Sequence, residues 1–473
     1  MKIVGRLNEQ AELKRYFDSG KPEFIAITGR RRVGKTYLIK ELFAEDIVFY
    51  FTGVVGKNIS NAYQLRRFDE TIAFYGGKDS QPSMEWADAF NKLKKLLKEP
   101  SSKRQVIFID ELPWLDAPKS DFLPALDLFW NSFASSRPDI MLVICGSAAS
   151  WIERNIFENK GGLHNRVTGR LKLAPFSLSE CEAFFNELGV VMNRYQIAET
   201  YMVFGGIPYY LNMFEKSLGP TQNTDRLLFA ENAPLRNEFN EIFSSLFRAS
   251  NRHTSIVCAL SKTASGLTRD EIIKAANIPG GGNLSRTLLE LEECGFIKKY
   301  TDFTKPKNDA CYRLIDPFVL YWLKYVKDNN AEDEYYWTNL IDDGKRRAWS
   351  GYAFEQLCLR HIPQIKHKLG ISGLSTEVFS WRSKNSSPGA QIDLLISRRD
   401  EVLNLCEIKF SLNPITITKK DEQLLQQKRT AFLSETGCRK AIHMTMITTY
   451  GLTEKGYRNS IQAEVTLDDL FAR

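Results

Sequence analysis

The stretch Gly29-Arg-Arg-Arg-Val-Gly-Lys35-Thr36 constrains the fold of this chain more than any other feature. It has the spacing Gly-x4-Gly-Lys-Thr, follows the apolar run Phe24–Thr28, and opens a helical pattern that continues to Phe43. A glycine-rich loop between a strand and a helix turns successive N–H groups toward phosphate, and the helix adds its positive end. Lys35 then reaches the β- and γ-phosphates, and Thr36 offers its hydroxyl to Mg²⁺. The loop therefore predicts a site for a nucleoside triphosphate and Mg²⁺.

Two further apolar runs predict neighbouring strands of a parallel sheet. Val106–Ile109 and Met141–Cys145 are short, continuous and flanked by segments with helical spacing, which is typical of strands covered by helices on both faces. The first run delivers Asp110 and Glu111 at its carboxyl end. We expect Asp110 to hold Mg²⁺ through water and Glu111 to polarise the attacking water of a hydrolysis reaction.

Composition narrows the class of protein. Hydrophobic residues make up 43% of the chain and charged residues 26%, which is usual for a globular protein and excludes disordered, collagen-like and coiled-coil chains. No apolar stretch approaches the ~20 residues needed to span a bilayer, so we expect no membrane partner. The eight cysteines include no Cys-x-x-Cys pair and predict reduced thiols in a cytoplasmic protein.

Five motifs, in this order along the chain, resemble those of the archaeal-type ATPases of the AAA+/STAND group. They are Ile3-Val-Gly5-Arg6-x-x-Glu9, Gly29–Thr36, Asp110-Glu111, Cys145-Gly-Ser147 and Gly206-Ile-Pro208. The resemblance implies that Gly5 and Arg6 touch the adenine side and that Ser147 is a sensor beside the γ-phosphate. It also implies that Pro208 packs near the nucleotide in a helical lid. The stretch Gly161–Arg170 resembles the family too, and either Arg166 or Arg170 is expected as the finger for transition-state charge.

These motifs define the expected ATP site. Its nucleotide-binding residues are Gly5, Arg6, Gly29, Val33, Gly34, Lys35, Thr36, Tyr37, Ser147 and Pro208. Its metal ligands are Thr36 and Asp110, and its catalytic residues are Lys35 and Glu111 with Arg166 or Arg170.

The pattern of apolar residues changes over residues 251–325. It indicates three short helices followed by two strands, which predicts a winged helix-turn-helix. The third helix has a leucine stripe at the spacing i, i+4, i+7, formed by Leu284, Leu288 and Leu291. The expected exposed face is left to Asn283, Ser285, Arg286 and Glu290. A recognition helix normally carries more basic and amide side chains than this. Two alternatives stay open: hairpin lysines, including Lys305 and Lys307, contact DNA phosphates, or the module packs on the ATPase as a structural arm.

A second set of charged residues lies near the carboxyl end of the chain. The run Leu403–Phe410 alternates as a strand, so Glu407 and Lys409 share one face. Asp393 lies on a neighbouring apolar strand, and Glu355 lies on a preceding helix. Two carboxylates on adjacent strands can bind Mg²⁺ next to a lysine that orients or deprotonates water, as phosphodiester hydrolysis requires.

This order of residues resembles the PD-(D/E)XK nuclease fold. The resemblance implies that Asp393 and Glu407 are metal ligands, Glu355 is an outer ligand and Lys409 is the catalytic lysine. Gln426 or Gln427 of the next helix is an expected accessory group. The chain departs from the family in lacking a proline–aspartate pair, since Gln391-Ile392 stands before the aspartate.

The expected fold class is α/β multidomain, with a parallel-sheet P-loop ATPase, a helical lid, a winged helix and a mixed α/β restriction-endonuclease-like domain. The expected domains are a core at 1–174, a lid at 175–247, a winged helix at 248–326, a linker at 327–349 and a nuclease-like domain at 350–473. Of a formal net charge of +7, the last domain carries +4, from 17 basic and 13 acidic residues. A basic surplus of this kind suits a polyanion.

Together these patterns predict a Mg²⁺-dependent, ATP-hydrolysing ATPase of the AAA+/STAND type that acts on or with DNA through a nuclease domain. The alternative is a nucleotide-gated DNA- or protein-binding switch with an inactive carboxy-terminal domain. DNA is the expected partner, through that domain and, on the first of the two alternatives for it, also through the winged helix. A homo-oligomer is a further expectation.

Overall fold

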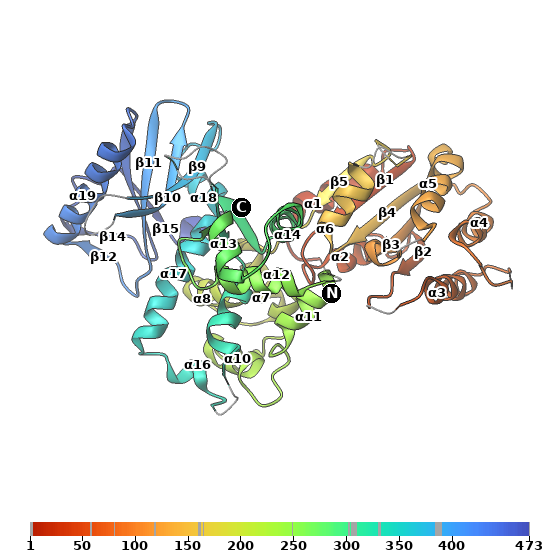
Figure 1. Ribbon diagram of the computed structural model, residues 1–473, viewed down its shortest axis with the longest axis horizontal. Helices are drawn as coiled ribbons and strands as arrows, with labels where there is room; N and C mark the ends of the chain where they lie inside the picture. The colour runs from red at the N-terminus through yellow and green to blue at the C-terminus, as the bar shows by residue number, and fades with distance from the viewer. Residues whose placement is uncertain are drawn as a thin grey trace. The chain divides into compact units, whose positions relative to one another are not determined.

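The computed structural model describes the chain in ranges. These are residues 3–56, 59–79, 81–117, 120–158, 162–163, 165–247, 249–300, 303, 310–329, 333–383 and 390–472. The chain divides into two compact units, each built from separated segments, and Figure 1 labels the elements of both. The first unit is Met1–Pro175 with Asn240–His253 and Ser285–Cys294, and the second is Phe176–Phe239 with Thr254–Leu284 and Gly295–Arg473.

A five-stranded parallel sheet forms the centre of the first unit. Its order is β2-β3-β4-β1-β5, so β4 lies between the strand before the glycine-rich loop and the strand that ends in Asp110. The strands are β1 (Glu23–Thr28), β2 (Ile47–Thr52), β3 (Gln105–Asp110), β4 (Ile140–Gly146) and β5 (Gly169–Lys172). This order brings the carboxyl ends of β1, β3 and β4 to one edge of the sheet, where α/β proteins bind ligands.

Helices cover both faces of this sheet. Phe24 and Ala26 of β1 join an apolar cluster with helices α3, α4 and α5, so Ile25 and Ile27 of the same strand point to the opposite face. The helices of this unit are α1 (Leu7–Phe17), α2 (Lys35–Leu42), α3 (Asn61–Phe74), α4 (Trp86–Leu96), α5 (Phe122–Ser132) and α6 (Ala149–Ile152). Every residue of β1, β3 and β4 is buried, which explains their continuous apolar sequences.

Gly29 is required by the packing of the loop after β1. Its φ is +150°, and a Cβ atom there would lie 2.4 Å from the main-chain oxygen of Leu173. Any side chain would therefore push β1 and the segment after β5 apart.

The second unit begins with a helical segment. Its first helices are α7 (Leu178–Leu188), α8 (Arg194–Phe204), α9 (Pro208–Leu211) and α10 (Pro220–Leu228). Ser177 and Asn193 form capping boxes at the starts of α7 and α8, where their side chains accept N–H groups of the first turn. Gly205 and Gly206 have φ near +68° and +66° and separate α8 from α9.

Three helices and a small sheet occupy the region where the sequence predicts three helices and a hairpin. We call these elements the helix–hairpin module: α12 (Asn251–Leu260), α13 (Arg269–Ala276), α14 (Gly282–Glu293), β6 (Leu267–Thr268), β7 (Ile297–Tyr300) and β8 (Cys311–Leu314). The strands form an antiparallel sheet of order β6-β8-β7. The chain enters the module through α11 (Glu238–Leu246). Lys305 and Lys307 lie outside the described residues.

A mixed five-stranded sheet forms the carboxy-terminal part of the second unit. Its order is β15-β13-β11-β10-β9, with β9, β10 and β11 antiparallel and β11, β13 and β15 parallel. The strands are β9 (Thr376–Arg382), β10 (Gln391–Arg398), β11 (Val402–Lys409), β13 (Ala441–Thr448) and β15 (Ala463–Thr466). The accompanying helices are α17 (Gly344–Arg360), α18 (Ile362–Lys368) and α19 (Lys419–Thr436), and β12 (Ile415–Ile417) pairs with β14 (Leu452–Gly456).

The expected linker at 327–349 needs correction. In its described part, Trp337 of α16 (Tyr336–Asn339) is buried, and Asp225 accepts hydrogen bonds from the Trp337 and Thr338 N–H groups at 2.7 and 3.1 Å. Helix α17 begins at Gly344, before the expected boundary. The acidic composition suggested a solvated link, but a buried tryptophan anchors this segment to α10.

Among the described residues, no helix has the length and apolar character needed to cross a membrane.

Candidate functional site

The Lys35 side chain lies at the centre of the expected phosphate site. Its Nζ donates to the main-chain oxygens of Gly29 and Arg30 at 2.9 and 3.1 Å and to Ser147 Oγ at 3.0 Å. Ser147 Oγ in turn donates to Glu111 Oε1 at 2.7 Å. One chain of hydrogen bonds thus joins the loop after β1 to the ends of β3 and β4.

Thr36 and Asp110 form the second part of this site. Thr36 Oγ1 donates to Asp110 Oδ2 at 2.5 Å, and the aspartate is buried at the end of β3. A hydroxyl and a carboxylate oxygen are ligands that suit Mg²⁺, so this pair fits the expected metal. Burial raises the pKa of the Tyr50 hydroxyl to about 12, and the negative charge of Asp110 is the second cause of this rise.

Glu111 is held in an unusual backbone conformation. Its φ of +48° lies in the left-handed region, which costs a residue with a side chain roughly 1 kcal/mol or more. Two contacts hold it there: its N–H donates to Asp110 Oδ1 at 2.8 Å, and its Oε2 accepts from the Ser147 N–H at 3.4 Å. The conformation turns the carboxylate toward Ser147 and Lys35 rather than away from the loop.

Gly5 and Arg6 connect the start of the chain to the same loop. Both have positive φ, of 66° and 56°, and Arg6 precedes α1. The Arg6 guanidinium is 5% exposed and donates through Nη2 to the Val33 main-chain oxygen at 3.3 Å. Tyr37 on α2 is 41% exposed. The structure therefore brings together the expected residues at the loop, including Gly34, which precedes α2 with a φ of 92°.

Arg166 and Arg170, the expected alternatives for an arginine finger, are both exposed. The Arg170 guanidinium lies 3.9 Å from the centre of the Phe157 ring, whereas Arg166 lies in a turn before β5. Residues 161 and 164 of the same stretch lie outside the described residues. Pro208 begins α9 in the second unit, so its expected contact with the nucleotide stays a prediction.

The segment Ser285–Cys294, which is most of α14 and the residue after it, belongs to the first unit and contacts the expected ATP site. The Cys294 thiol donates to the Ser147 main-chain oxygen at 3.9 Å. Glu290 accepts from Arg154 Nη2 at 3.1 Å and interacts with His253 Nε2 at 2.9 Å.

The expectation that Glu290 faces solvent is wrong, because this residue is only 9% exposed. Burial favours a higher pKa for Glu290, but hydrogen bonds from His253 and Arg286 outweigh it and hold that pKa below the ordinary value. The helical period does not reveal ion pairs with distant elements. Asn283, Ser285 and Arg286 are exposed as expected.

The three expected carboxylates of the carboxy-terminal domain lie close together. Glu355 is on α17, Asp393 on β10 and Glu407 on β11. Burial, together with the negative charges of Asp393 and Glu407, raises the pKa of Glu355 to about 8. Carboxylate oxygens are the donors that Mg²⁺ prefers, so the chemistry of this set fits the metal.

Two of these carboxylates, Asp393 and Glu407, already interact with side chains of the protein. Lys428 Nζ on α19 donates to Glu407 Oε2 at 2.6 Å, and Gln391 Nε2 donates to Asp393 Oδ1 at 2.6 Å. Arg313 Nη1 on β8 lies 4.0 Å from the same Asp393 oxygen. Within the described part of the chain, no three His, Cys, Asp or Glu side chains are arranged to hold a metal ion.

Lys409 forms its ion pair with a residue outside this cluster of carboxylates. Its Nζ is 3.5 Å from Asp421 Oδ1, whereas Lys428 reaches Glu407. Gln426 is half-buried and Gln427 is exposed on the same helix as Lys428.

Lys428 and Arg313 are functional candidates that sequence reasoning missed. A signal for Lys428 exists, because Leu425, Lys428 and Phe432 recur at helical spacing and the two apolar members are buried. No such signal exists for Arg313, which is about 80 residues from its partner and belongs to another module.

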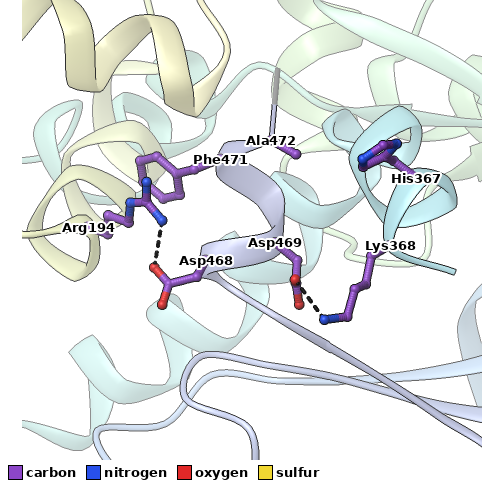
Figure 2. Close-up of a pocket in the computed structure, with 7 residues that line it drawn as sticks. All are labelled: Arg194, His367, Lys368, Asp468, Asp469, Phe471 and Ala472. Atoms are coloured by element: carbon purple, nitrogen blue, oxygen red, sulfur yellow. Dashed lines mark hydrogen bonds and ion pairs between the residues drawn. The ribbon is translucent and has the colours of Figure 1, made fainter.

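A separate pocket of about 490 Å³ lies beside α18 and η5 (Asp468–Phe471), and Figure 2 shows its lining. Arg194 Nη1 is 3.1 Å from Asp468 Oδ1, and Lys368 Nζ is 2.9 Å from Asp469 Oδ1. These ion pairs already use the Arg194 and Lys368 charges, so we assign this pocket no ligand.

The parallel sheet, the glycine-rich loop with Lys35 and Thr36, and the carboxylates after β3 define a P-loop ATPase. Residues 3–214 match a family described as an ATPase domain predominantly from Archaea.

Two known proteins resemble a larger part of the chain. An uncharacterized protein of Methanocaldococcus jannaschii is 24% identical over 416 residues, which cover 86% of this chain and 87% of that protein. The Walker-type ATPase of Pyrococcus abyssi superposes with a TM-score of 0.50 at 19% identity, covering 68% of this chain and 96% of that one. The second likeness shows a shared fold.

Proposed function

We propose that this ATPase binds ATP with Mg²⁺, hydrolyses it, and acts on or with DNA through a carboxy-terminal nuclease-like domain. The observation that carries the ATP half is the hydrogen-bonded chain Lys35–Ser147–Glu111 beside the Thr36–Asp110 pair. Lys35 would contact the β- and γ-phosphates, and Thr36 and Asp110 would hold Mg²⁺, which would neutralise phosphate charge. Glu111 orients the attacking water, and Ser147 links it to the γ-phosphate side.

The arrangement of the mixed sheet supports a nuclease-like domain. Helices α17 and α18 are followed by three antiparallel strands, the short strand β12, helix α19 and the parallel strand β13. Asp393 and Glu407 lie on the adjacent strands β10 and β11. When bound there, Mg²⁺ supplies a Lewis acid and an activated water. Asp393 and Glu407 would hold it, with Glu355 as an outer ligand.

The helix–hairpin module has the order of elements of a winged helix-turn-helix, and we propose that class for it. Its contacts favour a structural arm over a DNA reader. Glu290 of α14 bonds to Arg154, and Cys294 just after the helix bonds to Ser147. The exposed face of α14 includes one basic residue, Arg286, among the described positions. We therefore assign DNA contact mainly to the carboxy-terminal domain.

A second candidate function is a nucleotide-gated switch whose carboxy-terminal domain binds DNA or a protein without cleaving it. The pairing of Glu407 with Lys428 and of Asp393 with Gln391 and Arg313 favours this candidate, because side chains already satisfy the carboxylates. A homo-oligomer suits either function, since Arg166 and Arg170 are exposed and one of them could serve as a finger toward a neighbouring copy.

A paired assay on the full chain tests both halves of the proposal. ATP hydrolysis and nicking of supercoiled, single-stranded and branched DNA are measured for the wild type, Glu111→Gln and Asp393→Asn. We expect Glu111→Gln to lower hydrolysis at least ~10²-fold while ATP still binds. Asp393→Asn should abolish Mg²⁺-dependent nicking and leave hydrolysis unchanged. If the wild type hydrolyses ATP but cuts none of these DNAs, the switch is the correct function.

A further inference from the structure

The hairpin of the helix–hairpin module is attached to the carboxy-terminal sheet. Phe303, between β7 and β8, lies with its ring 5.3 Å from that of Phe379 and 5.2 Å from that of Phe432. Its N–H donates to the Ser380 main-chain oxygen at 3.3 Å. These contacts fix the hairpin on β9 and α19, the elements that flank the carboxylates.

Arg313 of this hairpin reaches the carboxylate cluster. Its side chain is 6% exposed, and its Nη1 lies 4.0 Å from Asp393 Oδ1. Its Nε donates to the Ser265 main-chain oxygen at 3.2 Å, and its guanidinium lies 5.0 Å from the Tyr300 ring centre. The guanidinium is therefore aimed by its own module and not by the sheet that carries Asp393.

A guanidinium in this position opposes the binding of a metal ion for two physical reasons. The negative charges of Asp393 and Glu407 lie beside Glu355, and Arg313 supplies part of the compensating positive charge from within the protein. An arginine stays protonated at any pH the fold survives, so its charge leaves the site only if the side chain or the hairpin moves. A Mg²⁺ ion would need an Asp393 oxygen at about 2.1 Å, and the like charge of the guanidinium beside Oδ1 opposes its approach.

We propose that Arg313 is an internal counter-ion that competes with a divalent cation for Asp393, so that the seating of the β7–β8 hairpin regulates the carboxylate site. This inference rests on the proposed function of that site. The counter-ion role of Arg313 explains why the three carboxylates have oxygen donors suited to Mg²⁺ but are not arranged to hold a metal ion. The regulated step is cation binding, which precedes any reaction on DNA.

The test is Mn²⁺ binding to the full chain without nucleotide, measured by titration calorimetry. Mn²⁺ accepts the same oxygen donors as Mg²⁺. We expect Arg313→Gln to bind Mn²⁺ at least tenfold more tightly than the wild type, and adding Asp393→Asn to that variant should remove the gain. Arg398→Gln is the matched control, because Arg398 lies on the same strand as Asp393 but pairs with Asp400, its Nε 2.9 Å from Oδ1.

The outcomes separate this inference from the proposed nuclease. If Arg313→Gln binds Mn²⁺ no more tightly than the wild type and Arg398→Gln, the inference is overturned, whether or not DNA is nicked. If tight binding is gained but no DNA is cut, the counter-ion role stands and the nuclease activity falls. Should Arg313→Gln fail to fold, Arg313→Lys decides: its shorter side chain should give a smaller gain of the same sign, and no gain would overturn the inference.

Discussion

The hydrogen-bond partners of individual lysines indicate which of them could take part in each proposed reaction. Lys35, the lysine of the phosphate-loop motif, bonds to two loop carbonyls and to Ser147. In the carboxy-terminal domain the motif points to Lys409, yet Lys428 is the lysine bonded to Glu407. An amine within hydrogen-bond distance of a ligand carboxylate is better placed to orient water than one engaged elsewhere.

We therefore predict that Lys428→Ala lowers Mg²⁺-dependent nicking roughly 10²-fold or more, whereas Lys409→Ala lowers it less than about tenfold. The physical reason is distance, since Lys428 Nζ is 2.6 Å from Glu407 and Lys409 Nζ is paired with Asp421 at 3.5 Å. The measurement is the initial nicking rate of the full chain on supercoiled DNA. Lys428→Arg keeps the charge and should retain part of the rate. The opposite ranking of the two alanine variants would return the role to Lys409.

At the residue scale, sequence reasoning succeeds where a motif fixes both identity and position. Lys35 bonds to Ser147 and Thr36 bonds to Asp110, because these residues lie at or after the carboxyl ends of strands of one parallel sheet. It fails for Glu290 and Arg313, whose partners come from other modules. Helical or strand period predicts which face a residue occupies, but not which distant ion pair buries it.

At the scale of elements, strands with continuous apolar sequences are predicted well. The expected runs at 24–28, 106–109 and 141–145 correspond to β1, β3 and β4, which are buried on both faces. The partly buried strands β2 and β9 were not predicted. Polar Glu377 and Ser380 interrupt the apolar pattern of β9, whereas β2 is a continuous apolar run whose signal was missed. The packing of α16 was not predicted either, because a single buried tryptophan, Trp337, anchors a segment that is otherwise acidic.

The joint between α17 and α7 gives a prediction about pH. His361, which follows α17, interacts through Nδ1 with the Leu357 main-chain oxygen at 2.8 Å and accepts the Leu178 N–H on Nε2 at 3.3 Å. A carbonyl only accepts, so Nδ1 carries the proton and the ring is neutral. Burial is the main cause that lowers the pKa of His361 from 6.5 to about 4.

Because the folded pKa of His361 is below its unfolded value, stability is complete above pH 6.5 and is lost as the pH falls toward 4. At pH 5 His361 is protonated in the unfolded chain but largely neutral in the folded chain. This difference lowers the free energy of unfolding by roughly 2 kcal/mol. Chemical denaturation at pH 7.5 and pH 5 measures the change. His361→Gln should show a drop smaller by about this amount, and the exposed His367→Gln should match the wild type. Equal drops in all three proteins would exclude His361 as the cause.

At the scale of the whole molecule, the first unit is discontinuous in sequence. It consists of the ATPase domain together with Asn240–His253 and Ser285–Cys294. Phe243, Leu288 and Leu291 in these segments are 1%, 2% and 0% exposed. The sequence predicts successive domains, each complete in itself, because local patterns do not show that a later helix completes an earlier fold.

This discontinuity predicts that a chain truncated after Pro175 does not fold stably, although it holds the whole phosphate-loop sheet. Each large apolar side chain that loses its burial removes about 1.5–3 kcal/mol, against a total stability of about 5–15 kcal/mol. The truncated chain should therefore aggregate or melt at least ~10 °C below the ATP-stabilised transition of the full chain. Thermal unfolding with and without ATP measures this, since a bound ligand raises only the transition of the unit that binds it.

Two point variants of α14 test the same idea in the intact chain. Leu291→Asp places a charge in the buried stripe and should lower the ATP-sensitive transition, because an unpaired charge in an apolar site costs several kcal/mol. Leu289→Asp is the matched control, since Leu289 is 48% exposed on the same helix and should leave that transition unchanged. A truncated chain that binds ATP and melts with the full-length protein would show instead that the first unit is complete by Pro175 and that α14 only rests on it.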